Sequence, residues 1–253
     1  MSNRIYSQLL YLTSATAPGW AFSKCPAERK ALNVACYFFR PTIMTNLQDK
    51  VWYACYGSNI LEERFLCYIK GGQPKGAKTT YEGCRNKTLP ADNEDFYISS
   101  ELYFAKESNN WDNGGVAFVR TLFEPQASTI GRIYLVTKGQ LIDIARQETN
   151  TKTELTIDFD KAINDSSYIL KRPSWYGNLL YLGRQNEYPI FTLTNENDLQ
   201  PFTKPNKNYI KTISKGIKEA HNFDDKTIFE YLKTKGGIKD NYTDQELIEI
   251  INE

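Results

Sequence analysis

The stretch that decides the fold is VWYACYGSN, residues 51–59, which leads directly into ILEERFL, residues 60–66. The first five residues form an apolar run typical of a buried strand, and the second segment is typical of a helix. A strand that turns through Gly-Ser-Asn into a helix leaves backbone N–H groups free at the helix start, where an anion or oxyanion can bind. Asn59 and Glu62 have the spacing of a capping box for this helix. The turn is therefore either an anion site or an ordinary strand–helix connection.

A second feature lies about ninety residues later and ends at Glu148. A capping box at Thr137 and Gln140 predicts the start of a helix there. The apolar face of this helix comprises Leu141, Ile144 and Ala145. Glu148 continues that face at spacing i+7, so its carboxylate is expected to point inward. Burial raises the pKa of a carboxyl, which suits a general acid or base near neutral pH. The alternative is a frayed last turn with Glu148 in solvent.

Taken together, these residues resemble the signature of the gamma-glutamylcyclotransferase-like superfamily. In that family a Tyr-Gly-Ser-Asn turn follows the first strand, and a Glu ends a later helix. Residues 53–59 resemble the turn, and residues 131–148 resemble the strand and helix that carry the Glu. Two further segments are similar to family features, residues 111–118 and 208–220. The resemblance covers roughly residues 44–220 and is greatest to a bacterial branch whose substrates are not assigned.

The resemblance implies an α+β fold, with a small barrel-like mixed sheet flanked by helices and a pocket at one barrel mouth. It implies an enzyme of the acyltransferase or lyase type that needs no metal and no cofactor. Such an enzyme cleaves a gamma-glutamyl amine or a related small amide by intramolecular cyclisation to 5-oxoproline. Glu148 would be the catalytic general acid and base. The substrate-binding residues would be Tyr53, Ala54, Cys55, Tyr56, Gly57, Ser58, Asn59 and Tyr209.

Thr149 departs from the family pattern, because members that act on glutathione or gamma-glutamyl amino acids usually have Gly after the catalytic Glu. This departure keeps open a non-catalytic module that binds a small metabolite or a partner in the same pocket. A third hypothesis is acyl transfer by a Cys55 thiolate, although a strand Cys is more often a small buried residue. His221 is the only histidine of the chain, so acid–base work falls to carboxylates, Tyr or Lys.

Composition limits the partners of the protein. The formal net charge is +1, which gives no indication of nucleic-acid binding, and no apolar run is long enough for a membrane span. The five cysteines are odd in number and lack a C-x-x-C motif, which is typical of reduced thiols in a cytoplasmic protein and not of a zinc site. We therefore expect a small-molecule substrate as partner. The oligomeric state stays open.

Three regions are expected along the chain. Residues 1–43 hold one acidic residue, Glu28, against five basic ones, and they precede the region of family resemblance. This N-terminal extension is interpreted as a non-native upstream start, a targeting segment or an extra packing element. We expect the extension to be dispensable for folding and for the site, because termini that are not tied down tend to be disordered. Residues 44–221 form the gamma-glutamylcyclotransferase-like domain, and residues 222–253 form a C-terminal helical extension.

Strands and helices follow each other in runs, which favours α+β over a regular α/β alternation. The predicted strands after the first are residues 96–105, 115–122, 130–136, 168–170, 178–182 and 190–193. A late helix is predicted at residues 208–221, and a second begins at Asp224 or Asp225. A last helix is predicted after Thr243, whose capping box is completed by Glu246.

Residues 71–95 are predicted to be a long basic loop. Such a loop is either a binding element or a solvated surface loop. The chain is also rich in tyrosine, and a polar pocket is expected to use four of these residues, Tyr56, Tyr134, Tyr176 and Tyr209.

Overall fold

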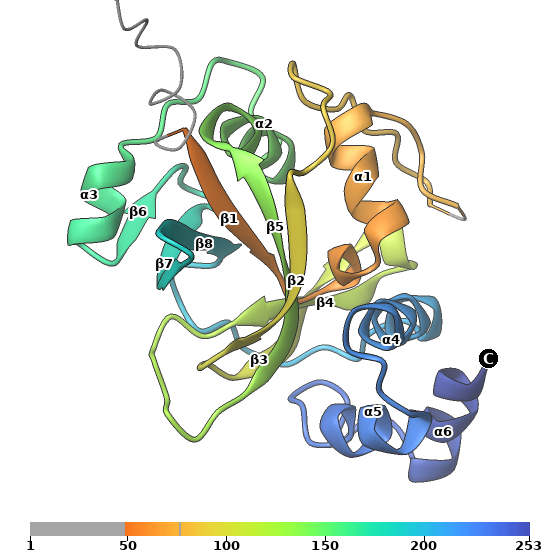
Figure 1. Cartoon of the computed structure of the whole chain (residues 1–253). Coiled ribbons are helices and arrows are strands. Elements are labelled where there is room, and N and C mark those ends of the chain that lie inside the picture. Colours follow the sequence, from red (N-terminus) through yellow and green to blue (C-terminus); the bar gives the residue numbers. More distant parts are fainter. Residues whose placement is uncertain (1–48, 76) are drawn as a thin grey trace, which may run out of the picture. The chain divides into compact units, whose positions relative to one another are not determined.

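The centre of the fold is strand β1 (Lys50–Cys55), in which every residue after Lys50 is buried. A strand covered on both faces needs a continuous apolar run, and Val-Trp-Tyr-Ala-Cys provides one. β1 pairs antiparallel with β5 (Thr129–Thr137) and parallel with β8 (Tyr188–Thr194). It therefore lies in the middle of the main sheet, as Figure 1 shows for this computed structural model. The structure describes residues 49–75 and 77–253, so the predicted extension of residues 1–43 lies outside the described residues.

The main sheet has six strands in the order β2-β5-β1-β8-β7-β6. Its other strands are β2 (Asp92–Ile98), β6 (Ser167–Ile169) and β7 (Asn178–Gln185). The β1–β8 pairing is parallel and the others are antiparallel. The sheet is open, with β2 and β6 at its two edges. A second, two-stranded antiparallel sheet joins β3 (Leu102–Ser108) to β4 (Gly114–Val119).

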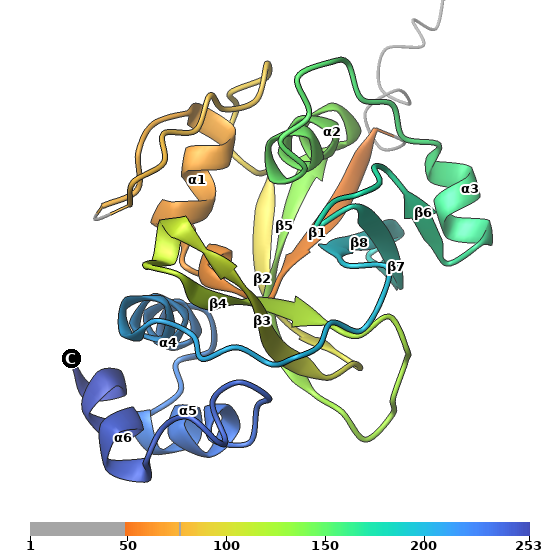
Figure 2. The same ribbon diagram turned by 180° about the vertical axis from the view of Figure 1, so that it is seen from behind.

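Six α-helices surround the sheets in the described part of the chain. They are α1 (Glu62–Lys70), α2 (Lys138–Glu148), α3 (Phe159–Asn164), α4 (Lys207–His221), α5 (Asp225–Leu232) and α6 (Asp244–Asn252). The predicted α+β class, with a mixed sheet flanked by helices, is confirmed. Figures 1 and 2 both show α2 beside one end of β1 and β5, with α4, α5 and α6 gathered at another corner. The sequence does not predict α3, because six residues are too few to display a helical period.

The capping signals for three helices are confirmed. Thr137 and Gln140 form the predicted capping box of α2, and Thr243 and Glu246 form that of α6. Asp224 caps α5 by accepting a hydrogen bond from the backbone N–H of Thr227. These short-range signals succeed because the cap and its partner lie only three residues apart.

The predicted strand 96–105 is broken. The chain bends at Ser99 and Ser100 and passes from β2 into the second sheet. The Ser100 hydroxyl donates to the Arg120 carbonyl oxygen at 2.6 Å and fixes this bend. β2 itself begins at Asp92, so the predicted loop ends earlier than expected.

The predicted capping box of Asn59 and Glu62 is also absent. A 3-10 helix, Ser58–Ile60, intervenes between the turn and α1. α1 begins after Leu61 without a side-chain cap. The tight 3-10 turn removes Asn59 from the position that a capping residue would occupy.

The last two helices pack into the same apolar core as the sheet. Ile228 and Leu232 of α5 and Leu247 of α6 are buried. The Tyr231 hydroxyl accepts a hydrogen bond of 3.1 Å from the Ile130 backbone N–H of β5. Among residues 49–75 and 77–253, none of the helices has the length and apolar character required to cross a membrane.

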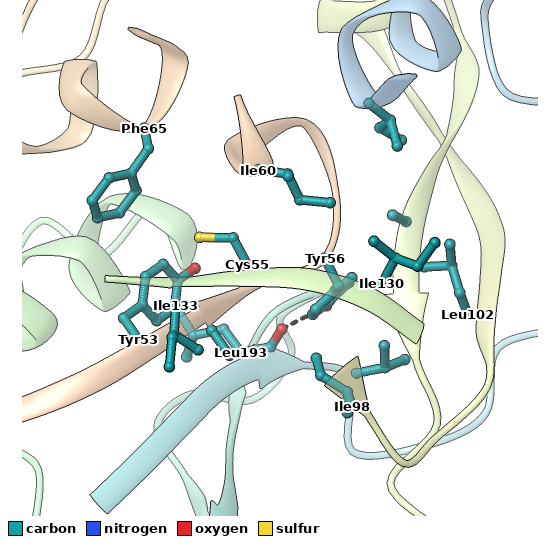
Figure 3. Close-up of a cluster of buried hydrophobic side chains, with 14 of the residues drawn as sticks. Tyr53, Cys55, Tyr56, Ile60, Phe65, Ile98, Leu102, Ile130, Ile133 and Leu193 are labelled. Carbon is teal, nitrogen blue, oxygen red and sulfur yellow. Dashed lines mark hydrogen bonds between the residues drawn. The ribbon is translucent and has the colours of Figure 1, made fainter. Parts of the chain in front are cut away.

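The core extends under the turn that follows β1. Figure 3 shows the Cys55 sulfur on the side of β1 that faces Phe65 and Ile60, whereas Tyr56 turns toward Leu193. The Tyr56 hydroxyl donates to the Leu193 carbonyl oxygen at 2.6 Å. The turn is therefore held from below by the core, which gives its backbone a fixed position.

Candidate functional site

A cavity of about 670 Å³ opens at the carboxyl end of β1. All eight predicted substrate-binding residues line it, and so does Glu148. Its remaining walls come from α1, from β4 and from segments that include Thr79, Tyr81, Trp111 and Trp175. Residues far apart in the sequence are thus brought together around one space. This volume falls in the range of small-molecule pockets.

Glu148 is the last residue of α2, and its carboxylate faces the turn after β1. The apolar face that precedes it, Leu141, Ile144 and Ala145, is fully buried. Asn59 Nδ2 donates to Glu148 Oε1 at 3.3 Å. The expected inward orientation is confirmed, and the alternative of a solvated, frayed end is wrong.

Burial raises the pKa of the Glu148 carboxyl above its ordinary value. Hydrogen bonding by Tyr68, the charge of Arg64 and the Asn59 amide act in the opposite direction. The cost of removing the carboxylate from water therefore outweighs the three groups that favour its charged form. A carboxyl in this situation can accept and return a proton closer to neutral pH than a free glutamate.

The turn itself is shaped by Gly57 and Tyr209. A Cβ atom at position 57 would lie 2.9 Å from the Tyr209 hydroxyl, so only glycine allows this approach without a shift. The Tyr209 hydroxyl accepts hydrogen bonds from the backbone N–H groups of Ala117, at 3.2 Å, and of Ser58. Burial raises the pKa of Tyr209 to about 12, so the hydroxyl keeps its proton at neutral pH.

The anion site expected at the start of α1 is not in the pocket. The first turn of α1 carries Glu62 and Glu63, and the Glu62 N–H donates to the Glu219 carboxylate at 3.4 Å. This helix start therefore already has an acidic neighbour. The turn itself, residues 57–59, does line the pocket.

Arg64 is the main site residue that the sequence reasoning missed. Its side chain projects from α1, and Tyr68, one helical turn later, lies on the same wall. Arg64 Nε donates to the Ser58 hydroxyl at 2.8 Å, and Nη2 donates to the Tyr81 hydroxyl at 3.3 Å. The i, i+4 spacing of Arg64 and Tyr68 on a short helix after the turn was the available signal.

Cys55 and Tyr134 differ from the other candidates. Cys55 lines the pocket, but it is almost fully buried. Burial is the main cause that raises the pKa of its thiol, and the nearby Glu148 charge raises it further.

Tyr134 does not line the pocket, so its expected role there is wrong. Its hydroxyl instead donates to the carbonyl oxygens of Asn59 and Ile60, both at 3.3 Å, and so supports the turn from behind. Tyr176, by contrast, does line the pocket.

The loop after α1 contributes to the site. Tyr81 and Thr79 line the pocket, and the hydroxyl oxygens of Tyr68 and Tyr81 lie within hydrogen-bonding distance at 3.2 Å. The Thr79 hydroxyl donates to Asn110 Oδ1 at 2.6 Å, which ties the loop to the opposite rim. This part of the loop is therefore a wall of the cavity, whereas its role in binding stays a prediction.

Thr149 and His221 have structural contacts. Thr149 follows α2 with φ −87° and ψ 0°, a conformation that does not require glycine, and its hydroxyl donates to the Ala145 carbonyl oxygen at 2.8 Å. His221 Nε2 lies 2.7 Å from the Gly131 carbonyl oxygen, and His221 is not among the pocket residues. In the described part of the chain, no three His, Cys, Asp or Glu side chains gather as a metal site.

No family model matches the chain. Over 190 residues, 67% of the chain, it is 34% identical to histone deacetylase 5 of Arabidopsis thaliana. The chain spans only 28% of the length of that relative. The structure is similar to that of a gamma-glutamyl cyclotransferase, with a TM-score of 0.44, 19% identity, and coverage of 81% of this chain and 99% of that one.

Two other solved structures are similar over 81% of this chain. One is an uncharacterised protein from Homo sapiens, with a TM-score of 0.43, 18% identity and 99% of its own chain covered. The other is a gamma-glutamyl cyclotransferase specific to glutathione from yeast, with a TM-score of 0.34, 11% identity and 96% coverage. All three TM-scores lie below 0.5, so these similarities do not assign an activity to the chain.

Proposed function

We propose that the protein is a gamma-glutamylcyclotransferase-type enzyme with Glu148 as its general acid and base. The observation that carries this proposal is the Glu148 carboxyl in the pocket, whose pKa burial raises and which accepts from the Asn59 amide. The proposed substrate is a gamma-glutamyl amine or a related small amide. The reaction is its cleavage to 5-oxoproline and a free amine.

In this reaction the substrate's own α-amine attacks its γ-carbonyl carbon. Glu148 first takes a proton from the α-ammonium, which frees the nitrogen lone pair for attack. As the tetrahedral intermediate collapses, the bond to the leaving amine breaks and Glu148 returns the proton to the departing nitrogen. Over the whole reaction the attacking nitrogen loses two protons and the leaving nitrogen gains two, so no water or redox partner is consumed. Ring closure within one molecule has a large entropic advantage, so the protein has mainly to fold the substrate.

The turn at Gly57, Ser58 and Asn59 is the proposed site for the oxyanion that develops on the γ-carbonyl oxygen, with the N–H groups of Gly57 and Asn59 as its donors because that of Ser58 donates to Tyr209. Its backbone is held by the core below and by Tyr209 above, so its dipoles need little rearrangement during reaction. The protonated Tyr209 hydroxyl lies at the same turn and supplies a further donor. Thr149 leaves Glu148 in place, because its conformation does not require glycine.

The binding-module hypothesis uses the same pocket without turnover. The thiol hypothesis is less favoured, because a thiolate at Cys55 would be formed in a buried place next to a carboxylate. Turnover and its dependence on Glu148 separate these alternatives.

The test is to incubate the full chain with a panel of gamma-glutamyl amines and peptides and to measure 5-oxoproline by mass spectrometry. Glu148→Gln keeps the size of the side chain and removes its proton-carrying role, and Glu154→Gln, at an exposed position, is the matched control. We expect product with the unchanged protein and with Glu154→Gln, but not with Glu148→Gln. Binding of panel members without any product would support the binding module instead.

A further inference from the structure

We propose that Arg64 binds a free carboxylate of the ligand, so that the pocket selects a zwitterion with one carboxylate. Applied to a gamma-glutamyl substrate, this inference rests on the proposed function and assigns the α-carboxylate to Arg64. The carboxylate-binding role itself needs only the contacts of this side chain.

The partners of Arg64 carry no negative charge. The residue is only 7% exposed, yet no carboxylate lies within 4.0 Å of its guanidinium in the described residues. Its contacts are the neutral hydroxyls of Ser58 and Tyr81 and the face of Trp111, whose ring centroid lies 4.8 Å from Cζ. A buried charge is costly unless an opposite charge compensates it. Because its partners are neutral, the Arg64 guanidinium can still bind an anion through its N–H groups.

Arg132 is buried to nearly the same extent as Arg64, at 6% exposure, but has different partners. Arg132 has two carboxylate partners, Glu62 at 3.1 Å and Glu219, and donates to Asn93 Oδ1 at 2.9 Å. The two arginines are therefore buried to nearly the same extent, but only Arg132 has carboxylate partners among the described residues. Arg132 faces protein acids, whereas Arg64 faces a cavity.

Two side chains of opposite charge line the pocket. Among the described residues that line it, Arg64 and Glu148 are the charged ones. They are close enough for the Arg64 charge to lower the pKa of Glu148, although they form no ion pair. An α-amino acid carries its ammonium and its carboxylate on the same α-carbon, so the carboxylate can contact Arg64 while the ammonium contacts Glu148.

The other described residues that line the pocket include no second cation for another carboxylate. They are neutral and include the aromatic rings of Tyr81, Trp111 and Trp175. A second carboxylate on the ligand would lose its hydration without gaining a charged partner. We therefore expect the part of the ligand beyond the amino acid group to be uncharged and compatible with aromatic contacts.

The experiment compares two matched probes, L-glutamine and L-glutamine α-carboxamide. They differ in one group, because the carboxamide replaces the carboxylate at nearly equal size. Binding of each probe to the full chain is measured by NMR titration. We expect the unchanged protein to bind L-glutamine about 10- to 100-fold more tightly than the carboxamide, the range of a charge-assisted hydrogen bond.

The variant Arg64→Gln should remove this preference, so that both probes bind with similar affinity, whereas Arg64→Lys should retain part of it. Arg184→Gln, at an exposed position, is the matched control. Equal binding of both probes by the unchanged protein, or no binding of L-glutamine, would overturn the proposal. If Arg64→Gln does not fold, the probe ratio of the unchanged protein and the result for Arg64→Lys decide the question.

The probe-binding experiment and the 5-oxoproline assay can fail independently of each other. Arg64-dependent binding without formation of 5-oxoproline would reject the enzyme and keep the carboxylate site. Glu148-dependent turnover with no effect of Arg64→Gln on the probe ratio would keep the enzyme and reject the carboxylate site.

Discussion

The clusters around Arg132 and Arg64 lie near the same turn after β1 and differ in how their charge is compensated. Arg132 Nη2 contacts Glu62 at 3.1 Å, Nη1 contacts Glu219, and Nε donates to Asn93. Arg64 contacts hydroxyls and an aromatic ring, and the carboxylate of its pocket, Glu148, forms no ion pair with it. The first cluster is complete without a ligand and serves the fold. In the second, Arg64 and Glu148 face the cavity without forming an ion pair, and perturbed charged groups in a cavity are typical of functional sites.

The largest expected effect is on catalysis, in the Arg64 cluster. Glu148→Gln should lower the rate of 5-oxoproline formation by about 10²- to 10⁴-fold, the usual contribution of a general acid or base. The measurement is a steady-state assay with the best substrate of the panel, beside Glu154→Gln. A rate close to that of the unchanged protein would remove Glu148 from the mechanism.

The same variant should be more stable at neutral pH. Burial raises the pKa of Glu148 in the folded protein above its value in the unfolded chain. Protonation of Glu148 therefore stabilises the fold. This contribution is fully present below the unfolded-state pKa and is lost as the pH rises through the folded-state pKa. Glu148→Gln avoids this loss, so its Tm should exceed that of the unchanged protein at pH 7 and approach it in acid. A lower Tm at pH 7 would contradict the sign of the shift.

The second expected effect is a difference in the free energy of unfolding between two variants, in which methionine replaces either Arg132 or Arg64. Arg132→Met should cost about 2–3 kcal/mol, less than a fully buried pair, because Glu62 and Glu219 retain 40% side-chain exposure. Arg64→Met should cost about 1 kcal/mol or less, because no carboxylate loses its partner. Thermal unfolding of both variants measures the difference. Equal losses would show that the two clusters do not differ in the way described.

The third effect is a shift in the pH dependence of activity. Glu148 must be ionised to accept the first proton, so the acidic limb of kcat/KM should follow its raised pKa. Hydrogen bonding by Tyr68 lowers that pKa, so Tyr68→Phe should move the limb to higher pH. Tyr97→Phe, at an exposed position outside the pocket, is the control. A limb that stays in place or moves to lower pH would contradict the role of Tyr68.

The smallest expected effect is that of Cys55→Ala. The thiol faces Phe65 and Ile60, and burial disfavours its ionised form, so we expect a rate within about twofold of the unchanged protein. The lost sulfur should cost about 1 kcal/mol of stability. Activity and Tm are measured together. Lost turnover with an unchanged Tm would support the thiol hypothesis.

Short-range patterns account for most of what the sequence predicts correctly. The apolar run of β1 and the capping boxes of α2 and α6 depend on neighbouring residues, and the structure confirms them. The orientation of Glu148 is also predictable, because its helix has one apolar face. In contrast, the break at Ser100 depends on a contact with Arg120, and the placement of Arg64 depends on Trp111 and Tyr81. Such contacts join segments that are distant in the sequence, so they cannot be predicted from a local sequence pattern.

The position of the pocket floor on β1 divides the site into two parts with different freedom to vary. Floor residues such as Tyr53 and Cys55 also belong to the core, so a substitution there disturbs packing as well as binding. Rim residues such as Thr79 and Trp175 lie on loops, where substitutions are tolerated more readily. Evolution or protein engineering could therefore change the group that the rim accepts while the floor stays the same.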